Sequence, residues 1–296
     1  MTARGRLPVP LALAAFAAAL VAKSAAPQFR SETRAVLVDV SVTRDGAVRG
    51  LGEADFELLV AGERTPFRML DPESLPLAVL FAMDESGSTR GDRRRRLAEG
   101  ARFFAGALTE RDACGVTAFS MAVRWVREFQ PCGPAIGERL LQSASGGATA
   151  LWDGIALSLA ALDQGQGRPV LLLFTDGQDN HSWVREDHLR RSVAGSEALF
   201  YAIVAQPPRP SRAVRVNSAG FALLEELAEA TGGRVLRITS DEGLRAAYQE
   251  VLEELRVRYV LAFTPDPSRR GFVPIEVRVR QRGAEVRARA GYAARP

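Results

Sequence analysis

The sequence contains few of the residues that bind zinc or cross-link small extracellular folds: its 296 residues include two cysteines and two histidines. Cys114 and Cys132 form no C-x-x-C motif and are too few for a disulfide framework. Hydrophobic residues make up 47% of the chain and charged residues 25%, as is ordinary for a globular protein. The composition therefore excludes disordered, collagen-like and coiled-coil chains, and it leaves oxygen atoms as the ligands of any bound metal.

The apolar run near the start of the chain is short. Arg4 and Arg6 precede the apolar residues 11–22, and small residues follow at positions 24–26. This order is typical of a secretory signal peptide, and a helix of about 18 Å falls short of the hydrocarbon core of about 30 Å. We therefore expect residues 1–26 to direct export to the periplasm or the outside, with no membrane span after cleavage.

The basic balance of the chain belongs mostly to that segment. The formal net charge is +4, and residues 1–26 carry Arg4, Arg6 and Lys23 but no acidic residue, so their removal leaves +1. Residues 93–96 are four arginines, which we interpret as the solvated face of a helix. Because no basic patch with interleaved aromatic residues accompanies them, the sequence does not indicate nucleic-acid binding.

The pattern of apolar residues changes twice along the chain. Residues 34–70 alternate as β-strands do, residues 76–256 alternate fully apolar strands with amphipathic helices, and residues 259–290 return to strands. We predict an α/β fold: a doubly wound, mostly parallel sheet with helices on both faces, over residues 76–256. Residues 27–75 and 257–296 should pack together as one small all-β domain, because two or three strands cannot form a stable sheet alone.

Finer features can be predicted from the same pattern. Residues 113–129 should form a hairpin, but pairing about Met121 offsets Cys114 from Cys132 by several residues, so a bridge between them stays open. A helix over 93–108 is expected to place Leu97, Phe103, Phe104 and Leu108 in the core, and residues 285–290 to form a single strand. The tryptophans at positions 125, 152 and 183 are expected to be packed.

Oxygen-bearing side chains follow two of the apolar strands and precede a helix. Asp84, Ser86 and Ser88 alternate after the strand that begins at residue 77, so a tight turn can direct three oxygens at one centre. Asp176 ends the strand that begins at residue 170, and Thr149 stands at the start of a helix after two glycines. Ligands of open α/β sheets bind beyond the carboxyl ends of the strands, so we expect these three loops to meet there.

Two carboxylates and three hydroxyls suit a small hard cation. The set matches Mg²⁺ or Mn²⁺ and has too few bidentate carboxylates for a calcium cage. Asp153 is interpreted either as an acid that supports the metal ligands from behind or as an acid of the first helical turn. Asp179 and Asn180 are interpreted as loop-forming residues near the site, and His181 and His188 as surface residues.

The same motifs resemble the metal-ion-dependent adhesion site of von Willebrand factor type A domains, over residues 76–256. The segments at 38–63, 259–265 and 286–292 are also similar to those of bacterial exported "VWFA-related" proteins. The resemblance implies that Ser86, Ser88 and Thr149 bind the metal directly and that Asp84 and Asp176 act partly through water. The remaining ligand is then a Glu or Asp of a partner protein. Ala148, between the glycines and Thr149, departs from the pattern and can shift that loop.

These features favour an exported, non-enzymatic module that binds a protein partner through Mg²⁺ or Mn²⁺. Two alternatives stay open. An aspartate after the first strand of an α/β sheet also serves Mg²⁺-dependent phosphotransfer or hydrolysis in haloacid-dehalogenase-like phosphatases, although the position of their general acid is Ser86 here. The other alternative is a structural scaffold whose metal site is vestigial.

Overall fold

The computed structural model describes residues 35–87, 92–136, 146–205 and 218–294. The predicted signal peptide, residues 1–26, lies outside these ranges, and so does Ser88. Within the described ranges, no helix is both long and apolar enough to cross a membrane.

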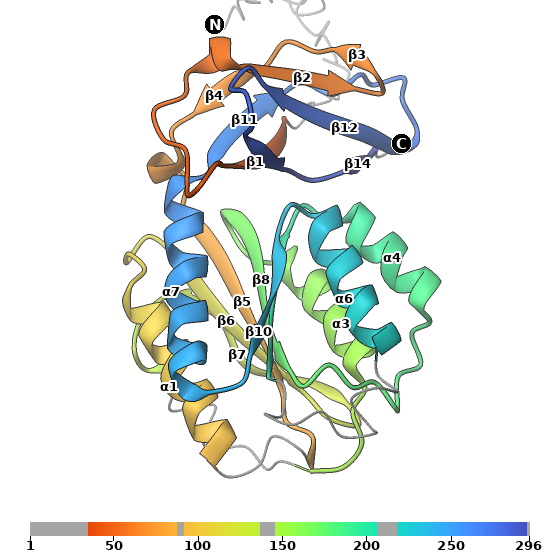
Figure 1. The fold of residues 1–296 in the computed structure, drawn as a ribbon. Helices are drawn as coiled ribbons and strands as arrows, with labels where there is room; N and C mark the ends of the chain where they lie inside the picture. The colour runs from red at the N-terminus through yellow and green to blue at the C-terminus, as the bar shows by residue number, and fades with distance from the viewer. Residues whose placement is uncertain (1–34, 88–91, 137–145, 206–217, 295–296) are drawn as a thin grey trace, which may run out of the picture. The chain divides into compact units, whose positions relative to one another are not determined.

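The α/β part is built on a six-stranded sheet with the order β10-β9-β8-β5-β6-β7 (Figure 1). All of its neighbouring strands run parallel except β7, which forms an antiparallel hairpin with β6. Strand order reverses at β5, so the carboxyl end of β5 is the switch point where ligands bind in such folds. The strands are β5 (Leu77–Asp84), β6 (Ala113–Phe119), β7 (Val123–Pro131), β8 (Arg168–Thr175), β9 (Leu199–Ala205) and β10 (Arg234–Ile238).

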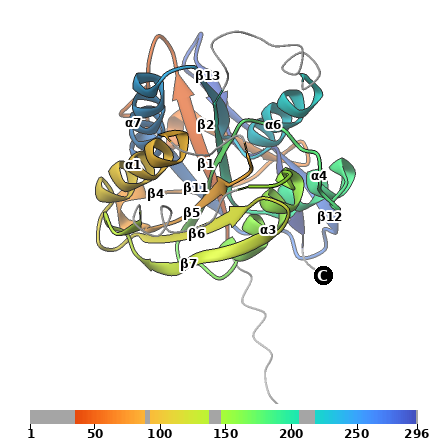
Figure 2. The same cartoon turned by 90° about the horizontal axis from the view of Figure 1, so that it is seen from below.

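Helices cover both faces of this sheet, as predicted (Figures 1 and 2). Side chains of β5 point alternately to the two sides: Phe81 joins the core that α1 and α7 cover, and Leu80 joins the core on the opposite face. Every residue of β5 is buried, which explains its uninterrupted apolar sequence. The helices are α1 (Asp92–Gly106) and α7 (Asp241–Val257) on one face, with α3 (Leu151–Leu162), α4 (Glu186–Gly195) and α6 (Ser218–Ala230) on the other.

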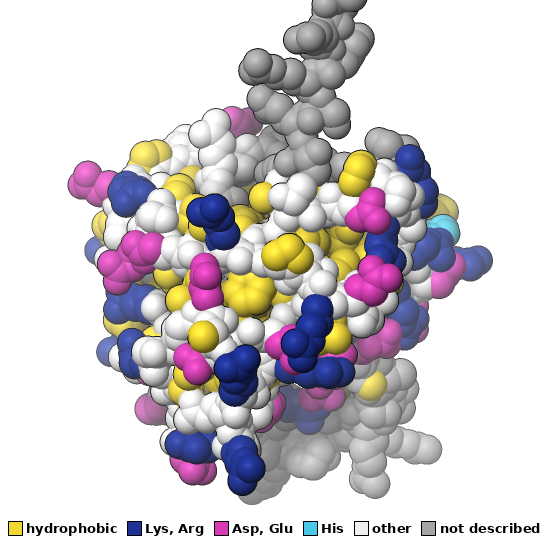
Figure 3. Space-filling view, turned by 90° about the horizontal axis from the view of Figure 1, so that it is seen from above, with side chains coloured by type: hydrophobic (Ala, Val, Ile, Leu, Met, Phe, Trp, Pro, Cys, Tyr) yellow, Lys and Arg dark blue, Asp and Glu magenta, His cyan; other side chains and the backbone are white. Residues whose placement is uncertain are grey.

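Strands from the two ends of the chain pair with each other, as the fold prediction required. Val38 lies opposite Leu261, and Leu58 lies opposite Val277. The first sheet has the order β13-β1-β11-β4 and the second β14-β12-β2-β3. On the outer face of this part, acidic and basic side chains are interspersed (Figure 3). Its strands are β1 (Val36–Thr43), β2 (Phe56–Val60), β3 (Glu63–Arg64), β4 (Arg68–Leu70), β11 (Tyr259–Phe263), β12 (Gly271–Val279), β13 (Glu285–Arg287) and β14 (Gly291–Ala294), with 3₁₀ turns at Glu53–Asp55 and Pro72–Ser74.

Two of the finer predictions about strands and helices are wrong. The expected strand over 285–290 ends early: β13 covers only Glu285–Arg287 and pairs with β1, and Ala290 N donates to the carbonyl of Ala230 on α6. Phe103 is 41% exposed. An α-helix turns by about 100° per residue, so Phe103 lies away from the core face of α1 that Leu97 and Phe104 share.

The two cysteines are joined by a disulfide, with 4.9 Å between the Cα atoms of Cys114 and Cys132. Bulges in the hairpin explain why simple pairing did not predict it. The register shifts on both sides of Val116, so Gln130 lies opposite Cys114 and Cys132 N bonds to the carbonyl of Asp112.

Candidate functional site

Asp84 ends β5 at the centre of the sheet, and the residue is 2% exposed. Oδ1 accepts a hydrogen bond of 2.9 Å from the backbone N of Ser86, and Oδ2 accepts one of 2.8 Å from the hydroxyl of Thr175 at the end of β8. Among the described residues, no cationic side chain pairs with Asp84. The fold therefore holds a buried carboxylate in a fixed orientation, with no counter-ion in the described part of the chain.

The turn after Asp84 is bonded to the glycine loop before α3. Gly146 N donates to the carbonyl of Glu85 at 2.9 Å, and Gly87 N donates to the carbonyl of Gly147 at 3.3 Å. The carboxylate of Glu85 accepts a 2.5 Å bond from the guanidinium of Arg124 on β7, so it forms an ion pair within the protein. These bonds hold the first two predicted loops side by side.

Thr149 is fixed by the third loop. Its N donates a 2.8 Å bond to Oδ1 of Asn180, and its carbonyl accepts bonds from the backbone N of Asn180 and of His181, at 2.9 and 3.1 Å. Oδ1 of Asp179 accepts a 2.8 Å bond from Leu151 N, which caps the first turn of α3. Sequence analysis treated Asp179 and Asn180 as loop-forming residues. The structure adds that they hold the Thr149 loop in place through hydrogen bonds, a role that no local sequence pattern indicates.

Asp153, in the first turn of α3, binds the backbone of the third loop, between β8 and α4. Its Oδ1 accepts bonds from the backbone N of Trp183 and of Val184, at 3.0 and 2.7 Å. The indole of Trp183 is 89% exposed, so the expectation that this tryptophan is packed is wrong. Since its backbone is tethered to α3, the side chain is presented to solvent on a fixed loop.

Asp176 follows β8 and is close enough to Asp84 to affect its charge. Burial, together with the negative charge of Asp176, raises the pKa of Asp84 to about 6, although the hydrogen bonds from Ser86 oppose the shift. Asp176 itself is half-buried, and its Oδ1 accepts a 3.1 Å bond from Gln178 N. Two carboxylates that repel each other in a buried site favour a bound cation.

Four of the five predicted metal ligands thus stand on loops that are bonded together at the carboxyl end of the sheet: Asp84, Ser86, Thr149 and Asp176. The donor set of carboxylates and hydroxyls fits Mg²⁺ or Mn²⁺. In the part of the chain that the structure describes, no cluster of three His, Cys, Asp or Glu side chains could hold a metal, so a zinc-type site is not formed there.

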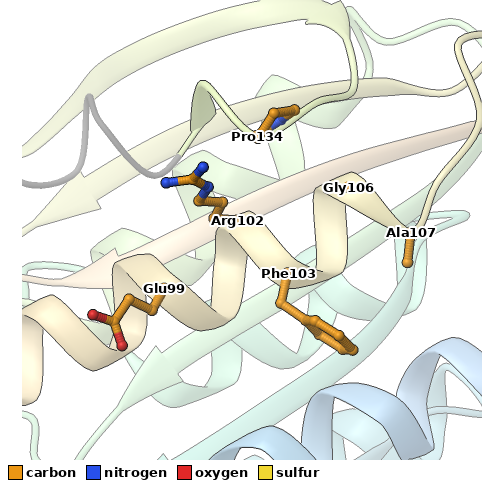
Figure 4. A pocket seen from close by; sticks show the side chains of 6 residues that line it. All are labelled: Glu99, Arg102, Phe103, Gly106, Ala107 and Pro134. Carbon is orange, nitrogen blue, oxygen red and sulfur yellow. The ribbon is translucent and has the colours of Figure 1, made fainter.

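Other hollows of the described surface lie away from these loops. One of about 430 Å³ runs along α1, where Glu99, Arg102 and Phe103 project from the helix opposite Pro134 (Figure 4). It has a single acid and a single base, and it offers no constellation of catalytic or metal-binding groups.

No family model matches the chain, and no curated protein matches it. The fold, however, matches solved structures. The von Willebrand factor type A protein from Catenulispora acidiphila superposes with a TM-score of 0.50 and 13% identity, over 90% of this chain and 74% of that one. The chain has a von Willebrand factor type A fold. In this fold, henceforth the VWA fold, the loops described above occupy one end of the sheet.

Two further structures share the VWA fold at a TM-score of 0.50. A variant of the PilB minor pilin from Streptococcus sanguinis is 12% identical, over 62% of each chain. Proximal thread matrix protein 1 from the mussel byssus is 15% identical, over 62% of this chain and 48% of that one. The matched region therefore spans less than two thirds of either protein, and the likeness establishes the fold alone.

Proposed function

We propose that this protein is an exported adhesion or scaffold module that binds Mg²⁺ or Mn²⁺ through Asp84, Ser86, Ser88, Thr149 and Asp176 and engages an acidic side chain of a partner protein. The observation that carries the proposal is the buried carboxylate of Asp84, which no described cationic side chain pairs, at the junction of three bonded loops. Only two negative charges face the cation, so it keeps affinity for a further carboxylate.

The surroundings of these loops suit protein binding. Trp183 is 89% exposed and Met121 is 54% exposed, and Met121 lies against Gly147, where an added Cβ would meet its sulfur at 2.9 Å. Tryptophan is prominent among the residues that dominate binding energy at protein interfaces. We infer that the partner carries apolar side chains beside its metal-bound carboxylate.

Export and the nature of the structural neighbours support the same role. A short apolar leader at residues 11–22 and a disulfide between Cys114 and Cys132 are both typical of proteins outside the cytoplasm. A minor pilin and a byssal matrix protein share the fold. We propose binding, not bond breaking, because the position two residues after Asp84 is a serine and cannot act as a general acid near neutral pH.

Calorimetric titration with Mg²⁺ and Mn²⁺ tests the metal site. We expect the wild type to bind the metal ion and Asp84→Asn to show no measurable binding. The control variant is Asp163→Asn, which removes an exposed acid at the end of α3 and should bind the metal ion as the wild type does. Pull-down from the native envelope fraction with and without chelator then tests the partner. Capture that ignores both the chelator and Asp84→Asn refutes metal-dependent adhesion, and phosphatase turnover that Asp84→Asn abolishes indicates an enzyme instead.

A further inference from the structure

A second cavity, of about 860 Å³, lies at the amino end of the sheet, away from the metal loops. Leu77, the first residue of β5, and Arg168, the first of β8, both line it, whereas Asp84 is at the opposite end of β5. The rest of the wall comes from Arg49, from the segment 72–76, from the loop between α1 and β6 and from the last turns of α7. The volume is within the range of about 300–1,000 Å³ that small-molecule sites occupy.

Four arginines from four separate segments line this cavity: Arg49, Arg111, Arg168 and Arg256. Arg111 and Arg256 each donate one bond, to the carbonyls of Ser74 and Ala107, both at 2.9 Å. Because a guanidinium has five N–H donors, most of their donors stay available to a ligand. Arg49 is exposed and forms no ion pair with the described residues.

Arg168 lies deepest in this group, with a side chain that is 3% exposed. It pairs with the carboxylate of Asp39 on β1, while its Nε has no hydrogen-bond partner among the described residues. Because Asp39 balances its charge, Arg168 contributes an unsatisfied buried N–H donor beside the cavity rather than net positive charge.

Three acids also line the cavity, but among the described residues none of them forms an ion pair with the four arginines. Asp112 is buried, and its two oxygens accept bonds from Leu77 N and from the N and hydroxyl of Thr109, each at 2.8 Å. The carboxylate of Asp112 is therefore already hydrogen-bonded within the protein. Glu73 and Glu253 also line the cavity, and both are exposed.

We propose that this cavity binds an organic anion that carries two or more carboxylate or phosphate groups. Guanidinium groups bind both carboxylates and phosphates. Because the four arginines come from separate segments of the chain, a ligand that contacts several of them needs more than one anionic group. Apolar side chains such as Leu108 and Leu252 complete the wall and suit the carbon body of an organic molecule. The site does not depend on the proposed metal site, since it lies at the other end of the sheet.

Calorimetry on the purified protein, freed of metal by a chelating resin, tests this proposal. The probes are citrate for carboxylates, pyrophosphate for phosphates, and inorganic phosphate as the probe with one group. We expect saturable binding of citrate or pyrophosphate, weakened about tenfold in Arg49→Gln and in Arg256→Gln, because each loses a charge-assisted hydrogen bond. The better probe identifies the chemistry of the ligand.

The matched control is Arg245→Gln, because Arg245 is exposed on the same helix as Arg256 but does not line the cavity. Its affinity should equal that of the wild type. Absence of saturable binding of either probe, equal weakening in Arg245→Gln, or equally tight binding of inorganic phosphate overturns the proposal. Thermal denaturation of each variant checks that it is folded.

Discussion

The hydroxyl of Thr175 donates a 2.8 Å hydrogen bond to Oδ2 of Asp84, and the hydroxyl oxygen of Thr175 in turn accepts a 3.0 Å bond from Gly177 N. The last residues of two neighbouring parallel strands are thus linked directly. Because the other oxygen of Asp84 is held by Ser86 N, the carboxylate cannot rotate freely. The orientation of the central acid is therefore a property of the sheet.

The first prediction concerns this link. Thr175→Val keeps the shape of the side chain but removes the hydroxyl that bonds to Asp84 Oδ2 and Gly177 N, which costs about 1–3 kcal/mol of the free energy of unfolding. Loss of a group that orients a metal ligand typically lowers metal affinity by about 10–100-fold. Calorimetry with Mg²⁺ measures the affinity, and Thr175→Ser, which keeps the hydroxyl, should bind as the wild type does. Equal affinities for the valine and serine variants contradict the assigned role.

The second prediction is a pH dependence of stability. In the metal-free protein the pKa of Asp84 is about 6, above its ordinary value of 3.8, so between these values the folded state binds more protons than the unfolded state. Stability due to this group therefore rises as the pH falls from 7.5 towards 4, by about 3 kcal/mol. Asp84→Asn should lack this contribution. Mg²⁺ binds the charged form and should stabilise the wild type at pH 7.5 more than at pH 5.

Urea unfolding at a series of pH values, for the wild type and Asp84→Asn with and without Mg²⁺, checks both statements. The difference between the two proteins isolates Asp84 from the other titrating groups. A difference that does not change with pH refutes the raised pKa.

The positions of Asp84 and Asp176 could be predicted because each follows a fully apolar run, and such a run indicates a buried parallel strand. The carboxyl ends of those strands necessarily lie at one edge of the sheet. By contrast, the contacts of Asp153 and Asn180 depend on the path of a loop that has no periodic pattern. Sequence reasoning placed both residues near the site but could not state what they hold.

Two other differences have the same origin in tertiary structure. The Cys114–Cys132 disulfide depends on bulges on both sides of Val116, and the sequence of the hairpin does not indicate them. The exposure of Trp183 depends on Asp153, which is 30 residues away along the chain. Apolar residues signal burial on average, so an apolar residue held at the surface by a distant contact is predicted wrongly.

The third prediction concerns Trp183. Under the proposed function, Trp183→Ala should lower partner capture about tenfold or more, since a central tryptophan commonly contributes over 1 kcal/mol to binding. Mg²⁺ affinity should not change, because the bonds of Asp153 are made to the backbone of residue 183. The control is Leu157→Ala, which removes another exposed apolar side chain, on α3. Equal capture by both variants, measured by quantitative pull-down, argues against a contact at Trp183.

The fourth prediction concerns Arg258, which joins the β part to the α/β part. Its guanidinium is fully buried and bonds to Oε1 of Glu254 at 2.6 Å, to the hydroxyl of Tyr201 and to the carbonyl of Asp39 on β1. Arg258→Leu removes these bonds from buried acceptors, so we expect it to lower the free energy of unfolding by about 3–5 kcal/mol. Arg245→Leu, at an exposed site on the same helix, should change it by less than about 0.5 kcal/mol.

Urea unfolding measures the effect of these substitutions, and Arg258→Lys provides a second variant if the leucine variant does not fold. Lysine keeps the charge beside Glu254 but lacks the planar fork that reaches several acceptors at once, so its stability should lie between those of the wild type and Arg258→Leu. A lysine variant as stable as the wild type shows that charge alone suffices. A leucine variant as stable as the wild type shows that these bonds do not hold the two parts of the fold together.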